Sequence, residues 1–172
     1  ENVVSKTADY QVLSAPNDPK LGNQKHMTNI KAAVAYDKFY APSVGLSKEV
    51  VIAVIDTGVD LNHEDLRANI WINSGEVAGN GRDDDGNGYV DDVNGYNFVS
   101  RIGDPSPEPR SDGGQIHGTH VAGLSAAVSN NGVGVAGVMG EKAKIMALNV
   151  FGKSAGTGTS AIDEAIRYAA DM

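Results

Sequence analysis

The sequence predicts an α/β fold with a parallel sheet flanked by helices. Two runs of mostly apolar residues, EVVIAVID (49–56) and AKIMALNVF (143–151), are typical of buried parallel strands. Segments in which apolar residues follow a helical spacing alternate with these runs along the chain. Strands that alternate with helices form a parallel sheet, because each crossover helix covers one of its faces.

The composition is that of an ordinary globular domain, with 172 residues of which 41% are hydrophobic. The net charge of −8 argues against nucleic acid as a partner and favours cations. No apolar run approaches the roughly 20 residues that span a membrane. Because cysteine is absent, disulfides and thiolate sites are excluded. The start, ENVVSKTADY, lacks the layout of a signal peptide, so we expect that none existed or that it was removed.

The elements follow in a clear order. Residues 1–24 are polar and turn-rich and are interpreted as an N-terminal arm, and residues 25–172 form the remaining domain. Helical spacing covers MTNIKAAVAYDKF (27–39), before the first strand. About sixty Gly- and Asp-rich residues then precede the helix HGTHVAGLSAAV (117–128), whereas connections in α/β folds usually have about 2–6 residues. The second strand leads to a last helix, SAIDEAIRYAADM (160–172).

Two polar residues stand where sites are built in such folds. Asp56 ends the first strand and is followed by the turn Thr57-Gly58, at the sheet edge that commonly carries active sites. An ordinary turn-capping aspartate remains the alternative. His117 opens a helix of small residues. A carboxylate that orients one histidine nitrogen leaves the other free to act as a general base.

The other histidines are predicted to be structural. His117 and His120 are three residues apart, whereas the zinc-protease pattern needs a spacing of four with a glutamate between, so zinc is not expected. We expect His120 to be packed and hydrogen-bonded, and we expect structural roles for His26 and His63.

The stretch RDDDGNGYVDD (82–92) predicts a calcium loop, because its aspartates repel one another unless a cation neutralises them. Its spacing matches the first nine positions of an EF-hand, with Gly88 at the turn position. The final bidentate glutamate is absent, and Asp92 is the proposed substitute. A solvated acidic turn is the alternative. The expected ligands in the loop 83–92 are Asp83, Asp85, Asn87, the carbonyl of Tyr89, and Asp91.

The segments VIAVIDTGVDLNHEDL and HGTHVAGLSAAVSNNGVGVAG resemble the subtilisin-like serine proteases, in particular their thermitase-like members. The resemblance runs from about Asn17 to the end but matches only the N-terminal part of that catalytic domain, so an incomplete domain is expected. It implies that Asp56 orients His117 and that His117 is the general base of an Asp-His-Ser triad. The template for these roles is that family's own triad.

Ser160 does not match the family's nucleophile. That serine lies in a Gly-Thr-Ser-Met-Ala-x-Pro motif, whereas GTSAIDEA has no such proline and places Ser160 only 43 residues after His117. We therefore expect Ser160 to be a helix N-cap, with Asp163 or Glu164 in the first turn. The nucleophile and the oxyanion-hole asparagine are expected beyond Met172.

The resemblance implies further binding residues. A second calcium site would fasten the N-terminal arm to the core. A third thermitase-like site is not expected, because Asn97 and Ser100 replace acidic ligands. The segment Gly156, Thr157 and Gly158 would pair with an extended peptide substrate, a flexible loop being the alternative. The ligands of the second site would be Asp18, Asp65, Asn131 and the carbonyls of Val128, Val133 and Val135.

The function that the resemblance implies is that of a secreted, extracellular, calcium-stabilised serine endopeptidase, of which this chain is the N-terminal portion. A complementary C-terminal chain would supply the serine, a prodomain would accompany the zymogen, and the substrate would be a polypeptide. The alternative is a catalytically inactive calcium-binding fragment or pseudoprotease that acts as a binding module. Neither nucleic acid nor membrane is expected as a partner.

Overall fold

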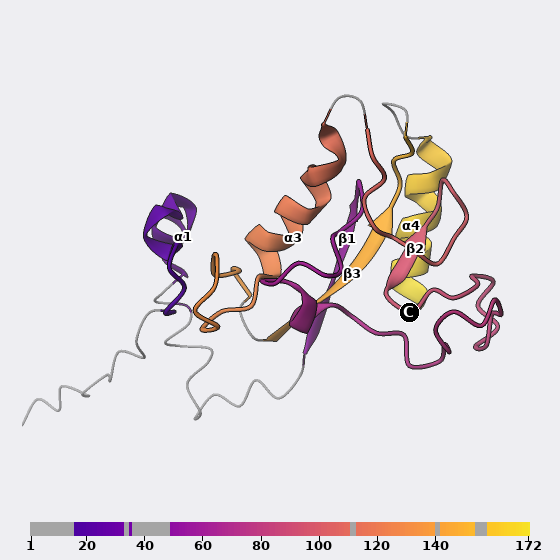
Figure 1. Cartoon of the computed structure of the whole chain (residues 1–172), viewed down its shortest axis with the longest axis horizontal. Coiled ribbons are helices and arrows are strands. Elements are labelled where there is room, and N and C mark those ends of the chain that lie inside the picture. The colour runs from indigo at the N-terminus through magenta and orange to yellow at the C-terminus, as the bar shows by residue number, and fades with distance from the viewer. Residues whose placement is uncertain (1–15, 33–34, 36–48, 111–112, 140–141, 154–157) are drawn as a thin grey trace, which may run out of the picture.

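The computed structural model describes residues 16–32, 35, 49–110, 113–139, 142–153 and 158–172. They contain a three-stranded parallel sheet in the order β1-β3-β2, with β1 at Val50–Asp56, β2 at Gly95–Asn97 and β3 at Ala143–Asn149 (Figure 1). In the register of both pairs, Asn149 lies beside the last residue of each neighbour, Asp56 and Asn97. All three strands therefore end at one edge of the sheet, and the predicted α/β class is confirmed.

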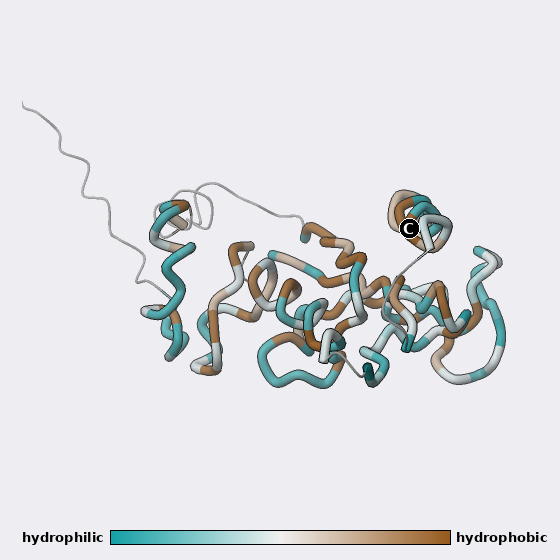
Figure 2. The backbone as a smooth tube through the Cα atoms, turned by 90° about the horizontal axis from the view of Figure 1, so that it is seen from above, coloured by the Kyte–Doolittle hydropathy of each residue, from teal (hydrophilic) through white to brown (hydrophobic). Residues whose placement is uncertain are grey.

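Helices α3 (His117–Ala126) and α4 (Thr159–Asp171) cover opposite faces of the sheet (Figures 1 and 2). Side chains alternate along β3: Ile145 and Ala147 pack on the α3 side, and Met146 and Leu148 pack on the α4 side. All four are at most 2% exposed. This central strand therefore contributes to an apolar core on each face of the sheet. It does not show the alternation of buried apolar and exposed polar residues that is typical of a surface strand.

Strand β1 is confirmed in its position, but the prediction that it is buried along its whole length was wrong. Val50 and Val51 are 48% and 45% exposed, and only Val54 is buried, at 4%. Within the described part of the chain, β1 pairs with β3 on one edge and has no strand on the other. The described chain therefore leaves the side chains at the start of β1 largely uncovered.

The predicted helix at 27–39 is interrupted. Helix α1 covers Lys25–Asn29, and Lys31 has a φ of 56°, which an α-helix does not accommodate. The rest of the predicted helix falls largely on residues 33–34 and 36–39, outside the described residues. The arm before it is docked on the core through Gln24, whose amide donates to the Ala136 carbonyl at 2.8 Å and accepts from its N–H at 2.9 Å.

The long connection between β1 and α3 is mostly irregular, as its composition predicts. It contains strand β2, which the sequence did not predict, and three-residue 3₁₀ helices at Arg67–Asn69 and Gly114–Ile116. A further 3₁₀ helix, Leu21–Asn23, lies in the arm. Among the residues described, no helix has both the length and the apolar character needed to cross a membrane.

The prediction that Ser160 caps α4 was wrong. The N-cap is Gly158, and Ser160 lies inside the first turn without a capping hydrogen bond. The first turn also lacks the acidic residue we expected, because Asp163 lies further along and pairs with Arg167 at 3.1 Å. A glycine N-cap leaves the first-turn N–H groups without a side-chain acceptor from the cap.

Candidate active site

The end of β1 and the start of α3 bring Asp56 and His117 together. Nδ1 of His117 lies 2.9 Å from Oδ1 and 2.8 Å from Oδ2 of Asp56. The Asp56 side chain is only 16% exposed, whereas that of His117 is 66% exposed. A covered carboxylate therefore holds Nδ1 while the rest of the ring stays open to a reactant. This is the arrangement of an oriented general base.

Glycines allow the two elements to approach so closely. A Cβ on Gly118 would lie 2.3 Å from the Gly58 carbonyl oxygen, and a Cβ on Gly58 would lie 2.4 Å from that of Pro105. Gly58 also has a φ of 92°, which favours glycine. Asp56 accepts the Thr57 N–H at 2.7 Å, so its carboxylate supports the turn as well as the histidine. The turn-capping interpretation and the orienting one are therefore compatible.

Ser160 makes no hydrogen bond with His117 among the described contacts, and its side chain is exposed on α4. Of the predicted substrate segment, Gly156 and Thr157 lie outside the described residues. Gly158 has extended φ and ψ values of −80° and 143°. After β3, the N–H of Val150 still donates to the Asp56 carbonyl at 2.9 Å, so the chain leaves the sheet beside the Asp56–His117 pair.

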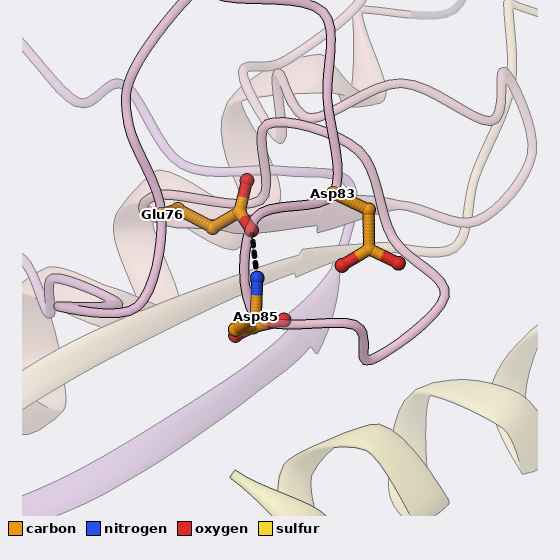
Figure 3. A group of neighbouring side chains, drawn as sticks. All are labelled: Glu76, Asp83 and Asp85. Atoms are coloured by element: carbon orange, nitrogen blue, oxygen red, sulfur yellow. Dashed lines mark hydrogen bonds between the residues drawn. The ribbon is translucent and has the colours of Figure 1, made fainter.

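The acidic loop brings three carboxylates together. Ligand atoms of Glu76, Asp83 and Asp85 all lie within 4.8 Å of one another (Figure 3). The backbone N–H groups of Gly88, Gly86 and Asn87 lower the pKa of the Asp83 carboxyl. Oε1 of Glu76 accepts from the Asp85 N–H at 3.2 Å, drawn as the dashed line, while Oε2 of Glu76 is buried without a hydrogen-bond partner.

Sequence reasoning missed Glu76, which comes seven residues before the loop. The signal was present: the loop has no final glutamate of the EF-hand type, so a carboxylate from elsewhere was needed. Asp91, in contrast, is outside the trio and accepts from the N–H groups of Asn80 and Gly81, each at 3.0 Å. Oδ1 of Asn87 accepts from the Tyr89 N–H at 2.8 Å.

The proposed substitute, Asp92, is completely buried and has other partners. Its carboxylate accepts from the Tyr168 hydroxyl at 2.6 Å and from the side-chain amides of Asn73 and Asn87 at 3.2 and 2.9 Å. These contacts tie the acidic loop to α4. Tyr89 adds a second tie, through its hydroxyl to Glu164 at 3.2 Å.

The described geometry can be compared with known proteins. The model of the subtilase family matches residues 47–172. The chain belongs to the subtilase family. A solved structure of a protease from Pseudoalteromonas arctica covers 89% of this chain and 43% of its own, with a TM-score of 0.59 and 31% identity.

Relatives of this subtilase include extracellular proteases. The halolysin-like extracellular serine protease Nep of Natrialba magadii is 32% identical over 96% of this chain and 26% of its own length. Halolysin of Haloferax mediterranei is 32% identical over 97% of this chain and 27% of its own length. The subtilisin-like protease 1 of Plasmodium vivax is 50% identical over 52% of this chain and 13% of its own length. The chain thus spans about a quarter of the halophile relatives.

The arm of the subtilase and the loop 128–135 surround two buried carboxylates, Asp18 at 4% and Asp65 at 2% exposure. Oδ2 of Asp18 accepts from the Asn130 N–H at 2.9 Å, and Oδ1 is buried without a partner. Asp65 accepts from the Asn131 amide and the Val135 N–H, each at 2.8 Å. Because a buried anionic oxygen without a partner is costly, these residues fit a cation.

Val128 and Val133 were predicted to bind calcium through their carbonyl groups, and the described hydrogen bonds of these two residues use their N–H groups. Val128 donates its N–H to the Asp65 carbonyl at 2.9 Å, and Val133 donates its N–H to Oδ1 of Asn131 at 2.7 Å. The Val128 bond holds one end of the loop on Asp65 and the Val135 N–H holds the other, whereas the Val133 bond lies within the loop. This leaves the carbonyl groups of the two valines available to a cation.

At the position of the third thermitase-like site, Asn97 and Ser100 both contact Glu108. Asn97 donates its side-chain amide to Oε1 of Glu108 at 3.1 Å, and the Ser100 hydroxyl donates to the same oxygen. Oδ1 of Asn97 is used by the Val99 and Ser100 N–H groups at 3.1 and 2.9 Å.

His26, His63 and His120 line a single cavity of about 880 Å³ between the arm, the loop after β1, and α3. Nδ1 of His63 accepts the Asp65 N–H at 3.1 Å, a structural contact. The expectation that His120 is packed was wrong: it is exposed on the cavity side of α3. One helical turn from His117, it falls on a face that the described chain does not cover.

Proposed function

We propose that this chain is the N-terminal part of the catalytic domain of a secreted, calcium-stabilised serine endopeptidase. The observation that carries the proposal is the contact of His117 Nδ1 with both carboxylate oxygens of Asp56, beside a largely exposed imidazole. Membership of the subtilase family and the extracellular proteases among the relatives support it.

In this proposal the chemistry is acyl transfer to a serine. Nε2 of His117 removes the proton from the serine hydroxyl as the oxygen attacks the peptide carbonyl, and then donates it to the leaving amine. Asp56 fixes the Nδ1–H tautomer and stabilises the imidazolium. The serine is supplied by a C-terminal portion of the protease, since Ser160 does not contact His117 in the described structure.

The substrate is a polypeptide in extended form. Residues 156–158 would pair with it by adding a strand, because the chain leaves the sheet beside Asp56 just before this segment. Backbone hydrogen bonds would then supply affinity, and side-chain pockets would select the sequence. A prodomain that occupies the same edge would keep the zymogen inactive.

Calcium is the proposed cofactor of two sites. Glu76, Asp83 and Asp85 form the centre of the first, with Asn87, the Tyr89 carbonyl and Asp91 as the remaining candidates in the loop. The second would use Asp18, Asp65 and Asn131, with the carbonyls of the loop valines. Carboxylate and carbonyl oxygens are the ligands that calcium takes, and its role here is to hold loops and arm to the folded core.

The test is the intact mass of the purified protein before and after a fluorophosphonate probe, with calcium and with a chelator. We expect the label on a co-purifying C-terminal chain and none on this one. Label on Ser160 would contradict the proposal that a C-terminal portion supplies the nucleophile. A C-terminal chain that is present but stays unlabelled would favour the inactive binding module.

A further inference from the structure

The turn after β1 links Asp56 with the start of α3, where His117 lies. Thr57 follows Asp56 directly, is only 7% exposed, and contacts Asp56 and the backbone on either side of His117. Its N–H donates to Oδ1 of Asp56 at 2.7 Å. Its hydroxyl lies against the backbone at the start of α3. One side chain and its own amide therefore connect the strand end with the helix start.

The hydroxyl of Thr57 makes two hydrogen bonds that bracket His117. It accepts the N–H of Gly118 at 3.0 Å and donates to the carbonyl of Gln115 at 3.2 Å. Helix α3 begins at His117, and its own N-cap, Ile116, offers no side-chain acceptor. Because first-turn N–H groups have no partner inside the helix, Thr57 supplies from the turn after β1 the cap that α3 lacks.

We propose that Thr57 is a positioning residue that sets the geometry of the Asp56–His117 pair, an inference that rests on the proposed function. A hydroxyl is required because the same oxygen both donates and accepts. Valine has nearly the same shape but offers neither interaction, and it leaves the Gly118 N–H and the Gln115 carbonyl without this partner in a covered site. Serine keeps both interactions.

The test compares Thr57→Val with Thr57→Ser in this chain by NMR. An Nδ1–H that donates to a carboxylate gives a proton signal far downfield, which reports the pair without any activity. We expect Thr57→Val to lose this His117 signal and the Gly118 amide to exchange at least about tenfold faster. Thr57→Ser should keep both. Thr119→Val is the matched control, because the Thr119 hydroxyl, in the same helical turn, accepts the Asp60 N–H at 3.0 Å and bonds no other described residue.

In the assembled protease we expect Thr57→Val to lower kcat by about 10- to 100-fold with KM nearly unchanged, since small displacements of reacting groups are costly. An unchanged His117 signal in Thr57→Val, or its loss in Thr57→Ser, would overturn the proposal. If Thr57→Val does not fold, exchange in the parent chain decides: a protected Gly118 amide supports the role of Thr57, and an unprotected one overturns it. Failure of the serine probe would affect only the proposed function, because the NMR signature does not depend on catalysis.

Discussion

Gly118 determines how closely the first turn of α3 can approach the end of β1. At Gly118, any Cβ would lie 2.3 Å from the Gly58 carbonyl oxygen and 3.2 Å from Asp56. Those are backbone and site atoms that have little freedom to move. The distance between Asp56 and His117 therefore depends on a residue without a side chain.

Replacing Gly118 with alanine should separate the two elements. We expect Gly118→Ala to lower the free energy of unfolding by about 2 kcal/mol, a typical cost of overpacking, and to weaken the Asp56–His117 contact. The measurement is urea unfolding of the chain. Gly123→Ala is the matched control in the same helix: its Cβ would meet nothing within 4 Å, so it should stabilise α3 by up to about 1 kcal/mol. Equal effects of the two substitutions would contradict this account.

The carboxylate of Asp56 gives a second prediction at this scale. In the assembled protease, Asp56→Asn should reduce kcat by about 10⁴-fold, because an amide in place of the carboxylate favours the wrong histidine tautomer. Circular dichroism should show the parent fold, since the change removes one charge and keeps the shape. Asp60→Asn, four residues further on and exposed, should have parental turnover. Full activity of Asp56→Asn would rule out the assigned role.

At the scale of elements, α4 and the acidic loop stabilise each other through Tyr168 and Asp92. Three side chains donate hydrogen bonds to the fully buried Asp92 carboxylate, and the bond from the Tyr168 hydroxyl is the shortest of them. Edge-to-face contacts of Tyr168 with Tyr89 and Phe98, at 5.0 and 5.7 Å between ring centroids, continue this packing. Helix α4 is therefore fixed both by its apolar face and by the loop.

Removal of the hydroxyl should loosen this contact. We expect Tyr168→Phe to lower the free energy of unfolding at pH 7 by about 1–3 kcal/mol, because a buried carboxylate loses a donor. Urea unfolding monitored by the single Trp71 gives the value. Ile166→Ala, at an exposed position of the same helix, is the control and should change stability by far less. A stability of Tyr168→Phe equal to that of the parent would show that the asparagine amides suffice.

The same tyrosine predicts how stability depends on alkaline pH. Burial, followed by the hydrogen bond to Asp92, raises the pKa of Tyr168, so the folded state keeps a phenol proton that the unfolded state loses near pH 10. This stabilisation is complete below about pH 10 and is lost as the pH rises further. In Tyr168→Phe the decline above pH 10 should be shallower by about 1.4 kcal/mol per pH unit, as urea unfolding across this range would show. An identical decline in the two proteins would mean that Tyr168 ionises equally in both states.

The elements also show which features were predictable. Strand ends and short motifs located Asp56 and His117, because the carboxyl edge of a parallel sheet is fixed by topology. The break of the first helix at Lys31 and the glycine cap at Gly158 depend on backbone angles that apolar spacing does not encode. Glu76 was not predicted because it lies outside the loop motif in the sequence and approaches Asp83 and Asp85 only in the folded structure.

At the scale of the whole molecule, calcium should link the arm and the acidic loop to the stability of the core. A cation that binds only the folded state contributes about 2.7 kcal/mol per site at one hundred times its Kd. We therefore expect a chelator to lower Tm by several degrees, measured by differential scanning calorimetry. Excess magnesium, which prefers a stricter octahedral geometry, should restore less. A Tm that does not respond to chelation would contradict both sites.

Variants assign this effect to the acidic loop. Glu76→Gln and Asp83→Asn should each reduce the rise in Tm that calcium produces, because each removes one of the three converging carboxylates. Glu64→Gln removes the same charge from an exposed residue outside the trio and should leave the rise unchanged. A full calcium response in Glu76→Gln would exclude Glu76 as a ligand.

The parallel pairing of β1 with β3 has a consequence for how the molecule folds. Val50 pairs with Ala143, and Asp56 meets His117 across 61 residues of chain, so the contacts that form the site all close long loops. Closing such loops costs entropy before any packing compensates for it, and chains dominated by distant pairings fold slowly. We therefore expect refolding to be slow, with the Asp56–His117 pair among its last contacts to form. In the proposed assembled protease, the catalytic pair would then be complete only after the sheet has formed.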